Sequence, residues 1–269
     1  MVDIAHYDHE TKRILQLGVP ITAGSVFESL FDAIAVALIS RYLGVEALSA
    51  YVVTNLLIGL SDTLISGVGS ALSTVCSHAI GADNYDLAGQ YTQIATVLYV
   101  ILAIPVLGVW WFVMDDFIRL FGMNERVVEI GVQYTKIVIF DYLFDGMFGT
   151  YSVLIYINGQ ATQSTIFGII TGALDCAATW LLCAFVEDVS LFWIGASMLS
   201  MSVLYHTGFT IFAIYKGWLD PFWNGMIKTF ALKNIPAVKN VLKTAIPLSF
   251  GSLVSYGEVS FSSCTDITL

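Results

Sequence analysis

Acidic side chains inside long apolar segments are the most chemically unusual feature of this sequence. Glu28 and Asp32 lie four residues apart, as do Asp141 and Asp145, and Asp175 stands alone in the middle of another apolar segment. An acid at the centre of a bilayer costs roughly 2.5 to 3.5 kcal/mol on insertion scales, so such residues normally face a cavity, a partner or an ion path. Many of them together therefore predict a polar cavity. The complete set is Glu28, Asp32, Asp62, Asp141, Asp145, Asp175, Glu258 and Asp266.

The spacing of these acids decides which of them can act together. Residues four apart share one helix face, so each of the two close pairs presents both carboxyls on one side of its helix. A carboxyl removed from water favours its protonated form, which allows proton exchange near neutral pH. The alternative for each acid is a structural carboxyl near a helix end or neutralised locally. We favour that alternative for Asp62 and Asp266, and Lys136 can offset one acid on its own helix.

The composition requires a nonpolar environment around much of the chain. Hydrophobic residues make up 57% of the 269 residues and charged residues only 12%, about half the share of a soluble domain. The formal net charge of -10 does not alter this conclusion, because many of the acids sit within apolar stretches. We therefore expect an integral, multi-pass membrane protein.

Seven apolar segments are long enough to be membrane-crossing helices, which need roughly 20 residues. They are too long and too continuously apolar for the strands of a membrane barrel. Short links between most of them predict helices that run alternately up and down. The segments are Ile14–Ile39, Tyr51–Ile80, Leu87–Met114, Val127–Ile157, Thr165–Val186, Leu191–Tyr215, and one from about Val241 to Leu269.

The basic residues predict the orientation, because cytoplasmic loops are enriched in lysine and arginine. One side has Arg41, Arg119 and Arg126. The other side, which carries the N-terminus and the connector before the seventh segment, has the larger set, and we place it in the cytoplasm; which membrane hosts the protein stays open. That set is Lys12, Arg13, Lys216, Lys228, Lys233, Lys239 and Lys243.

An internal repeat indicates how the chain is organised. Lys12–Val26 aligns without a gap with Lys239–Leu253, and lysine, leucine, proline, glycine and serine coincide. A second copy of the six-helix unit therefore begins near Lys239, and because six crossings return the chain to its starting side, the copies would be parallel repeats. The expected fold is all-α, with a six-helix transmembrane lobe and the first helix of a second lobe. The boundaries are 1–13 for a cytoplasmic N-terminus, 14–216 for the lobe, 217–240 for a cytoplasmic connector, and 241–269 for the truncated second lobe.

Metal chemistry and proteolysis are not supported by the sequence. His78 and His206 are single and far apart, and the four cysteines fall within apolar segments without the paired spacing of a zinc site. An intramembrane protease would need a glycine-flanked serine with a partner histidine, or an aspartyl pair with its own motif, and neither is present. We expect no metal site and no enzyme.

Several short motifs resemble those of the multidrug and toxic compound extrusion (MATE) family. The most specific is the second-segment run from Gly67 through Ala71-Leu72-Ser73-Thr74 to Ser77, whose small residues also favour close helix packing. The resemblance covers nearly the whole chain. The other motifs are Gly18-Val19-Pro20, Arg41-Tyr42-Leu43-Gly44, Glu46-Ala47-Leu48, Gly81-Ala82, Asn84-Tyr85, Asn158-Gly159-Gln160 and Gly195-Ala196.

The resemblance implies a two-lobed antiporter that exports organic, often cationic, compounds in exchange for protons or sodium ions. The implied partners are a small organic substrate, membrane lipid and the missing second lobe of the same protein. No nucleic acid is expected, and no cofactor beyond the coupling ion.

The resemblance also locates a cation site. Prokaryotic members carry an acid on the first helix and an Asn and an Asp one turn apart on the fifth. Counting back from Arg41, the first acid should fall at Ala35, but here it is Asp32; Asp175 takes the Asn position and Thr179 the Asp position. We therefore expect a displaced coupling site of Asp32, Asp175, Glu28 and Thr179. Asp141, Asp145 and Glu258 would line the substrate cavity, with Glu258 near the seventh-helix glutamate of eukaryotic members.

Two other functions remain compatible with the sequence. A lipid-linked oligosaccharide flippase has a related two-lobe architecture, although the chain offers few cationic cavity residues for a pyrophosphate-linked lipid. A non-transporting membrane scaffold is the other alternative, because the sequence lacks the second wall of the cavity.

Overall fold

The computed structural model describes residues 9–266, and for residues 9–14, 16, 17, 253 and 255–266 it describes the backbone alone. The described chain is almost entirely helical and contains no strand, as the apolar segments predicted. The long helices are α1 (His9–Tyr42), α2 (Val45–Ile65), α3 (Gly67–Gly81), α4 (Tyr85–Leu120), α5 (Glu125–Ile155), α6 (Ala161–Phe185), α7 (Leu191–Tyr215) and α8 (Ile235–Asp266). Short helical turns complete the path: η1 (Tyr156–Gln160), η2 (Asp220–Phe222), η3 (Asn224–Lys228) and η4 (Ala231–Lys233).

Five stretches of the described chain are long and apolar enough to cross a membrane. The stretch from Glu125 to Phe185 holds two crossings, because the chain reverses direction at Gly159 within η1. Gly159 adopts φ 87°, a conformation that side chains with a Cβ atom rarely take. The predicted six crossings of the lobe are therefore present, and the described part of the seventh apolar segment, 241–266, lies within α8.

Side-chain caps and a mid-helix break define the ends of several helices. The Asn84 and Asn124 side chains accept the backbone N–H of Leu87 at 3.0 Å and of Val127 at 2.9 Å, which caps α4 and α5. The second apolar segment is two helices, α2 and α3, that meet at Ser66 rather than one straight helix. The break places a run of small residues against α8.

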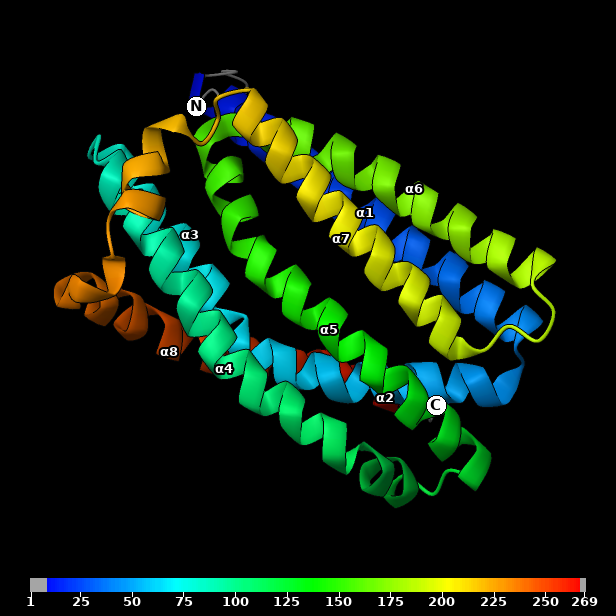
Figure 1. Ribbon diagram of the computed structural model, residues 1–269. Helices are drawn as coiled ribbons and strands as arrows, with labels where there is room; N and C mark the ends of the chain where they lie inside the picture. Colours follow the sequence, from blue (N-terminus) through cyan, green and yellow to red (C-terminus); the bar gives the residue numbers. More distant parts are fainter. Residues whose placement is uncertain (1–8, 267–269) are drawn as a thin grey trace, which may run out of the picture.

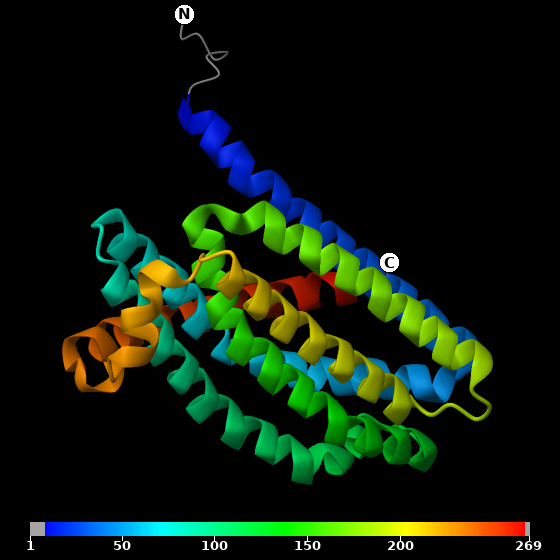
Figure 2. The ribbon, with the colours of Figure 1, turned by 45° about the horizontal axis from the view of Figure 1, so that its top comes forward.

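The helices form two groups with α5 between them (Figure 1). On one side α1 lies along α6, and α6 packs against α7; on the other side α3 packs against α4 and α8. The α5 helix contacts α4, α2 and α7, so it belongs to both groups. Figure 2 shows α1 and α6 side by side along most of their length. Although the link from α1 to α2 is short, the main neighbour of α1 is α6.

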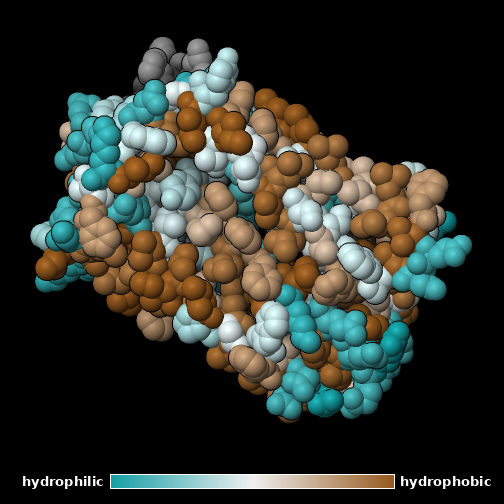
Figure 3. Space-filling view, viewed as in Figure 1, coloured by the Kyte–Doolittle hydropathy of each residue, from teal (hydrophilic) through white to brown (hydrophobic). Residues whose placement is uncertain are grey.

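The surface has the polarity of a membrane protein. Apolar side chains cover most of the face in Figure 3, and hydrophilic residues gather at the two ends of the bundle. At one end Arg119 pairs with Asp115 at 3.3 Å and with Glu125 at 3.2 Å. These ion pairs are exposed and contribute little stability, so they mark a water boundary rather than a core contact.

The connector between α7 and α8 is fixed to the end of α4. Gln93 donates to the carbonyl of Met226 at 2.9 Å and accepts the backbone N–H of Ala231 at 2.6 Å. Asn234 donates to Gln90 at 2.8 Å. We call these five residues the connector clamp. The connector expected at 217–240 is therefore a packed part of the structure, and α8 begins at Ile235, before the expected start near Val241.

Candidate ion and substrate site

The carboxyls predicted to act together come from helices that meet on one side of the bundle. Glu28 and Asp32 lie on α1, Asp141 and Asp145 on α5, and Asp175 on α6. The charges of Glu28 and Asp145 are close enough to interact, and so are those of Asp141 and Asp175. Packing of α1 on α6 and of α7 on α5 brings residues that are more than 100 positions apart into one acidic region.

Direct contacts set the register between α1 and α6. Thr165 on α6 donates to the carbonyl of Pro20 at 3.2 Å, and the Cys176 thiol donates to the carbonyl of Phe31 at 3.7 Å. The ring of Phe31 also lies against Gly172, where a Cβ atom would collide with it. Because Phe31 and Cys176 are in contact, the residues next to them, Asp32 and Asp175, lie at the same level of the two helices.

Asp32 and Asp175 share two nearby groups. The charges of both interact with Tyr51 on α2 and with Cys176. No hydrogen bond joins their carboxyls within the described part of the chain. The hypothesis that they share one ion stays a prediction.

Buried polar atoms without partners concentrate at this site. Asp141 Oδ1, Asp175 Oδ1 and Thr179 Oγ1 are inaccessible and have no hydrogen-bond partner among the described residues, although the Ser202 hydroxyl interacts with the Asp141 carboxyl. Such atoms normally have a partner, because leaving one unpaired costs about 1 to 3 kcal/mol. Asp175 and Thr179 lie one turn apart on α6, and the Asp141 charge interacts with that of Asp175. Oxygen atoms of these types can accept a proton or bind a small cation.

Asp145 has a partner that the sequence did not single out. His206 on α7 places its Nε2 atom 3.1 Å from Asp145 Oδ1. The His206 side chain is only 5% exposed, whereas that of Asp145 is 73% exposed. The signal available in the sequence was that His206 is the sole ionisable residue of types Asp, Glu, Lys, Arg and His in the sixth apolar segment.

An aromatic wall adjoins this pair. The Phe148 ring stacks on the His206 ring with 5.2 Å between centroids and 15° between planes, and Phe144 continues the stack at 6.4 Å from Phe148. Tyr205 meets His206 edge-on at 4.9 Å. Flat aromatic faces beside a carboxylate can bind an organic cation through both charge and the ring quadrupole.

Asp62, which we expected to be structural, faces Tyr99. The Tyr99 hydroxyl lies 3.4 Å from Asp62 Oδ1 and donates to the carbonyl of Tyr142 at 2.9 Å. The Asp62 charge also interacts with that of Asp145. Asp62 therefore lies on the α2 side of the same acidic region.

The predicted site positions on α1 differ in exposure, and the one on α8 is described only by its backbone. Ala35, where the family register placed the first acid, is 7% exposed and belongs to the packed core. Asp32 and Glu28, one and two turns earlier, are accessible in this chain. The backbone of Glu258 lies in α8, but its side chain is outside the described residues.

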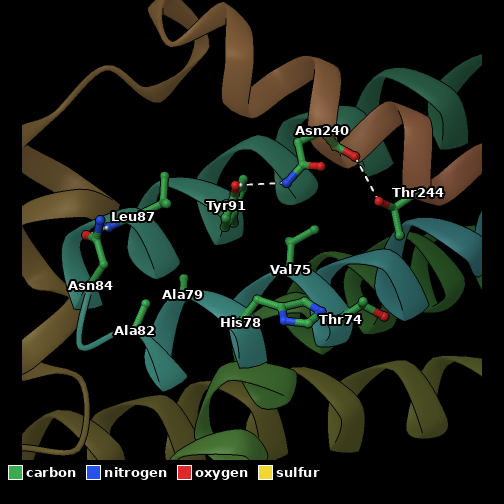
Figure 4. Close-up of a pocket in the computed structure, with 10 residues that line it drawn as sticks. All are labelled: Thr74, Val75, His78, Ala79, Ala82, Asn84, Leu87, Tyr91, Asn240 and Thr244. Atoms are coloured by element: carbon green, nitrogen blue, oxygen red, sulfur yellow. Dashed lines mark hydrogen bonds between the residues drawn. The ribbon is translucent and has the colours of Figure 1, made fainter.

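A separate groove opens between α3, α4 and α8. It encloses about 390 Å³ and contains none of the predicted site residues. Figure 4 shows Asn240 donating to the Tyr91 hydroxyl, at 3.0 Å, across its wall. Among the described residues no three His, Cys, Asp or Glu side chains are grouped so as to hold a metal ion. The carboxyl region, rather than the groove, carries the chemistry that the sequence indicated.

A bundle of membrane-crossing helices with a shared set of internal carboxyls defines the chain as a polytopic membrane protein with a polar interior. The chain belongs to the MatE family, that of the multidrug and toxic compound extrusion transporters, whose pattern matches residues 20–174. This match confirms the family that the motifs indicated.

Comparison with individual relatives gives the same result. Protein DETOXIFICATION 15 of Arabidopsis thaliana is 21% identical over 245 residues, which cover 88% of this chain and 49% of the relative. Protein DETOXIFICATION 25 of the same plant is 29% identical over 212 residues, covering 73% and 38%. The chain thus spans about half the length of the curated relatives that it matches.

Solved structures share the fold. The Vibrio cholerae MATE transporter VcmN in its bent form superposes with a TM-score of 0.78 at 18% identity, covering 94% of this chain and 56% of VcmN. A MOP superfamily transporter from Pyrococcus furiosus gives a TM-score of 0.73 at 17% identity, covering 90% and 52%. At these identities the likeness concerns the architecture of the helices.

Proposed function

We propose that the full-length protein is a secondary active antiporter that exports organic, cationic compounds in exchange for protons or sodium ions, and that this chain supplies its first lobe. Membership of the MatE family supports transport. The buried, unpaired oxygens of Asp175 and Thr179 support cation coupling within this lobe, because they have no hydrogen-bond partner in the described chain.

In this proposal the acids have two roles. Asp32, Asp175, Glu28 and Thr179 bind the coupling ion between α1 and α6. Asp141 and Asp145 on α5, with Glu258 on α8, line the cavity that receives the substrate. A small organic molecule is the substrate, lipid surrounds the lobe, and a second lobe completes the cavity.

The proposed orientation places the connector on the cytoplasmic side. Lys216 at the end of α7 and the connector lysines Lys228 and Lys233 lie at one end of the bundle, and Arg119 and Arg126 lie at the α4–α5 turn at the other end. Single cysteines at Lys233 and at Arg126 in intact cells provide the test. An impermeant maleimide should label only the cysteine at Arg126, and labelling of the reverse set would invert the orientation.

The coupling site is tested by Asp32→Asn and Asp175→Asn in the full-length protein. Reconstituted vesicles would be loaded with the fluorescent cation ethidium, and its gradient-driven movement followed under a proton gradient and, separately, a sodium gradient. We expect each variant to lose gradient-driven movement while expression and melting temperature stay unchanged. The wild-type response to the two gradients identifies the coupling ion.

Asp116→Asn is the matched control, because it removes an exposed acid at the end of α4, away from the site. It should transport like the wild type. Unchanged transport in both site variants would refute the assignment of Asp32 and Asp175, and the absence of transport in the wild type would refute the antiporter itself.

A further inference from the structure

We propose that Asp145 and His206 form a proton-binding pair, separate from Asp32 and Asp175, in which the protonated imidazole and an organic cation compete for the Asp145 carboxylate. This inference rests on the proposed export of cations. It assigns the competition between proton and substrate to one residue pair between α5 and α7.

The geometry gives the two side chains different access. The imidazole of His206 is enclosed, with only 5% of its side chain exposed, and its Nε2–H donates to Asp145 Oδ1 at 3.1 Å. The Asp145 side chain is 73% exposed, so most of its surface remains open to a second partner on the side away from the ring. A ligand can therefore reach the carboxylate without displacing the imidazole.

The charges around the pair are nearly all acidic. Besides Asp141, which lies on α5 with Asp145, the acids whose charges interact with Asp145 are Glu28 on α1 and Asp62 on α2. The titratable hydroxyls of Tyr99 on α4 and Tyr205 on α7 also face it. The acid of α6, Asp175, interacts with Asp141 instead.

His206 is the basic side chain available to these acids. Within the described chain it makes the only ion pair with any of the acids of this region. Histidine ordinarily gains or loses its charge near physiological pH, which suits it to a proton-driven step. When the ring is neutral, the Asp145 charge has no counterion; when the ring is protonated, the pair is neutral.

The proton is taken up and released at one nitrogen atom of His206. With Nε2–H already donated to Asp145, the arriving proton binds to the free Nδ1 atom of the imidazole. The net charge of the pair changes from one negative charge to zero, and the bound organic cation loses its counterion and leaves. Loss of the Nδ1 proton restores the negative charge and the affinity for the next cation.

The neighbouring aromatic rings favour a planar organic cation over a small inorganic one. Phe148 stacks on the imidazole at 5.2 Å and Phe144 extends that surface. A flat cation placed against these rings meets both their π faces and the Asp145 carboxylate. The protonated imidazole of His206 would be stabilised by the same Phe148 ring. The imidazolium and the organic cation therefore share the ring and the Asp145 carboxylate as partners.

The experiment measures ethidium binding to the purified full-length protein by fluorescence from pH 6 to pH 8, with proton release recorded in weak buffer. In the wild type, affinity should fall as the pH falls, by up to about tenfold per pH unit, the limit for one competing proton. Binding should release up to one proton. His206→Gln, which keeps an N–H donor but does not titrate, should bind ethidium with the dependence on pH and the proton release both lost.

Controls separate this role from a structural one. His78→Gln removes an exposed histidine on α3 and should keep the wild-type dependence on pH. Asp145→Asn changes an accessible side chain and should weaken ethidium binding at every pH. If His206→Gln melts at a lower temperature than the wild type, Asp145→Asn takes its place.

The outcomes separate this inference from the proposed function. If the wild type shows gradient-driven transport but His206→Gln or Asp145→Asn keeps the wild-type slope with pH, the pair is not the proton site and the antiporter still stands. If Asp32→Asn alone removes the slope, the competing proton binds there and the inference is wrong. A wild type that transports no cation under either gradient would refute both.

Discussion

The connector clamp and the acidic region both contain polar side chains within an apolar bundle. They differ in whether the polar atoms of those side chains have hydrogen-bond partners. In the clamp the Gln93 amide uses both its donor and its acceptor, at 2.9 Å and 2.6 Å. In the acidic region Asp141, Asp175 and Thr179 each leave a buried oxygen without a partner. Satisfied polar groups hold elements together, whereas unsatisfied ones remain available to a ligand.

The two regions also differ in how closely they are packed, and the connector is again the more tightly held. Gly225 of the connector lies directly against the backbone of Asp86, with no room for a Cβ atom. In the acidic region Glu28 and Asp32 are exposed, and much of the side of α1 away from α6 is uncovered in this chain. The clamp is therefore expected to resist change in its residues, while the acidic region should tolerate substitution at a cost to function.

The largest effect is expected from Gly225→Val, next to Met226 of the clamp. The new side chain would collide with the carbonyl of Asp86, and neither backbone can move without disturbing α4. We expect the free energy of unfolding to fall by about 4 kcal/mol or more, measured by thermal unfolding in detergent. Gly108→Val is the control, because nothing lies within 4 Å of its Cβ position. An equal loss in both variants would mean that helix propensity, and not the close approach, is responsible.

A smaller loss is expected from Gln93→Leu. This change removes both hydrogen bonds of the amide and leaves the buried N–H of Ala231 unpaired. The free energy of unfolding should fall by about 2 to 3 kcal/mol, measured in the same way. Gln133→Leu, at an exposed position of α5, should change it little. A stable Gln93→Leu protein would show that the connector does not depend on the clamp.

The smallest effect on stability is expected from Thr179→Val, together with a loss of transport. The valine has the same shape but lacks the buried hydroxyl that has no partner. Stability should be unchanged or rise by about 1 kcal/mol, because no hydrogen bond is lost. Gradient-driven ethidium movement should fall, because an ion ligand is removed. A clear loss of stability together with full transport would place Thr179 among the structural residues.

Much of the fold could be predicted because hydrocarbon imposes a strong rule on sequence. Each crossing needs a long apolar run, and segments such as Leu87–Met114 contain no charge, so the six crossings of the lobe were visible. The break between α2 and α3 at Ser66 could not be predicted, because it lies inside one long apolar segment. The glycine reversal at Gly159 appeared only as a short polar link between two segments.

The candidate site could be predicted in part. The presence of Asp32, Asp141, Asp145 and Asp175 was evident from their cost within a membrane. Their grouping was not, because it depends on α1 lying along α6 and α7 along α5 rather than on the order of the helices. His206 could be noticed but not assigned, since its partner is 61 residues away.

The sequence alone determined that the chain crosses a membrane, which family it belongs to, and which acids need an explanation. These properties depend on local composition and short motifs, which are present in the linear order of residues. The tertiary structure decided that Asp145 faces His206, that Asp32 and Asp175 stand level, and that Gly225 meets Asp86. The physical reason is that such contacts depend on the rotation and register of whole helices, and these are set by the packing of many side chains at once.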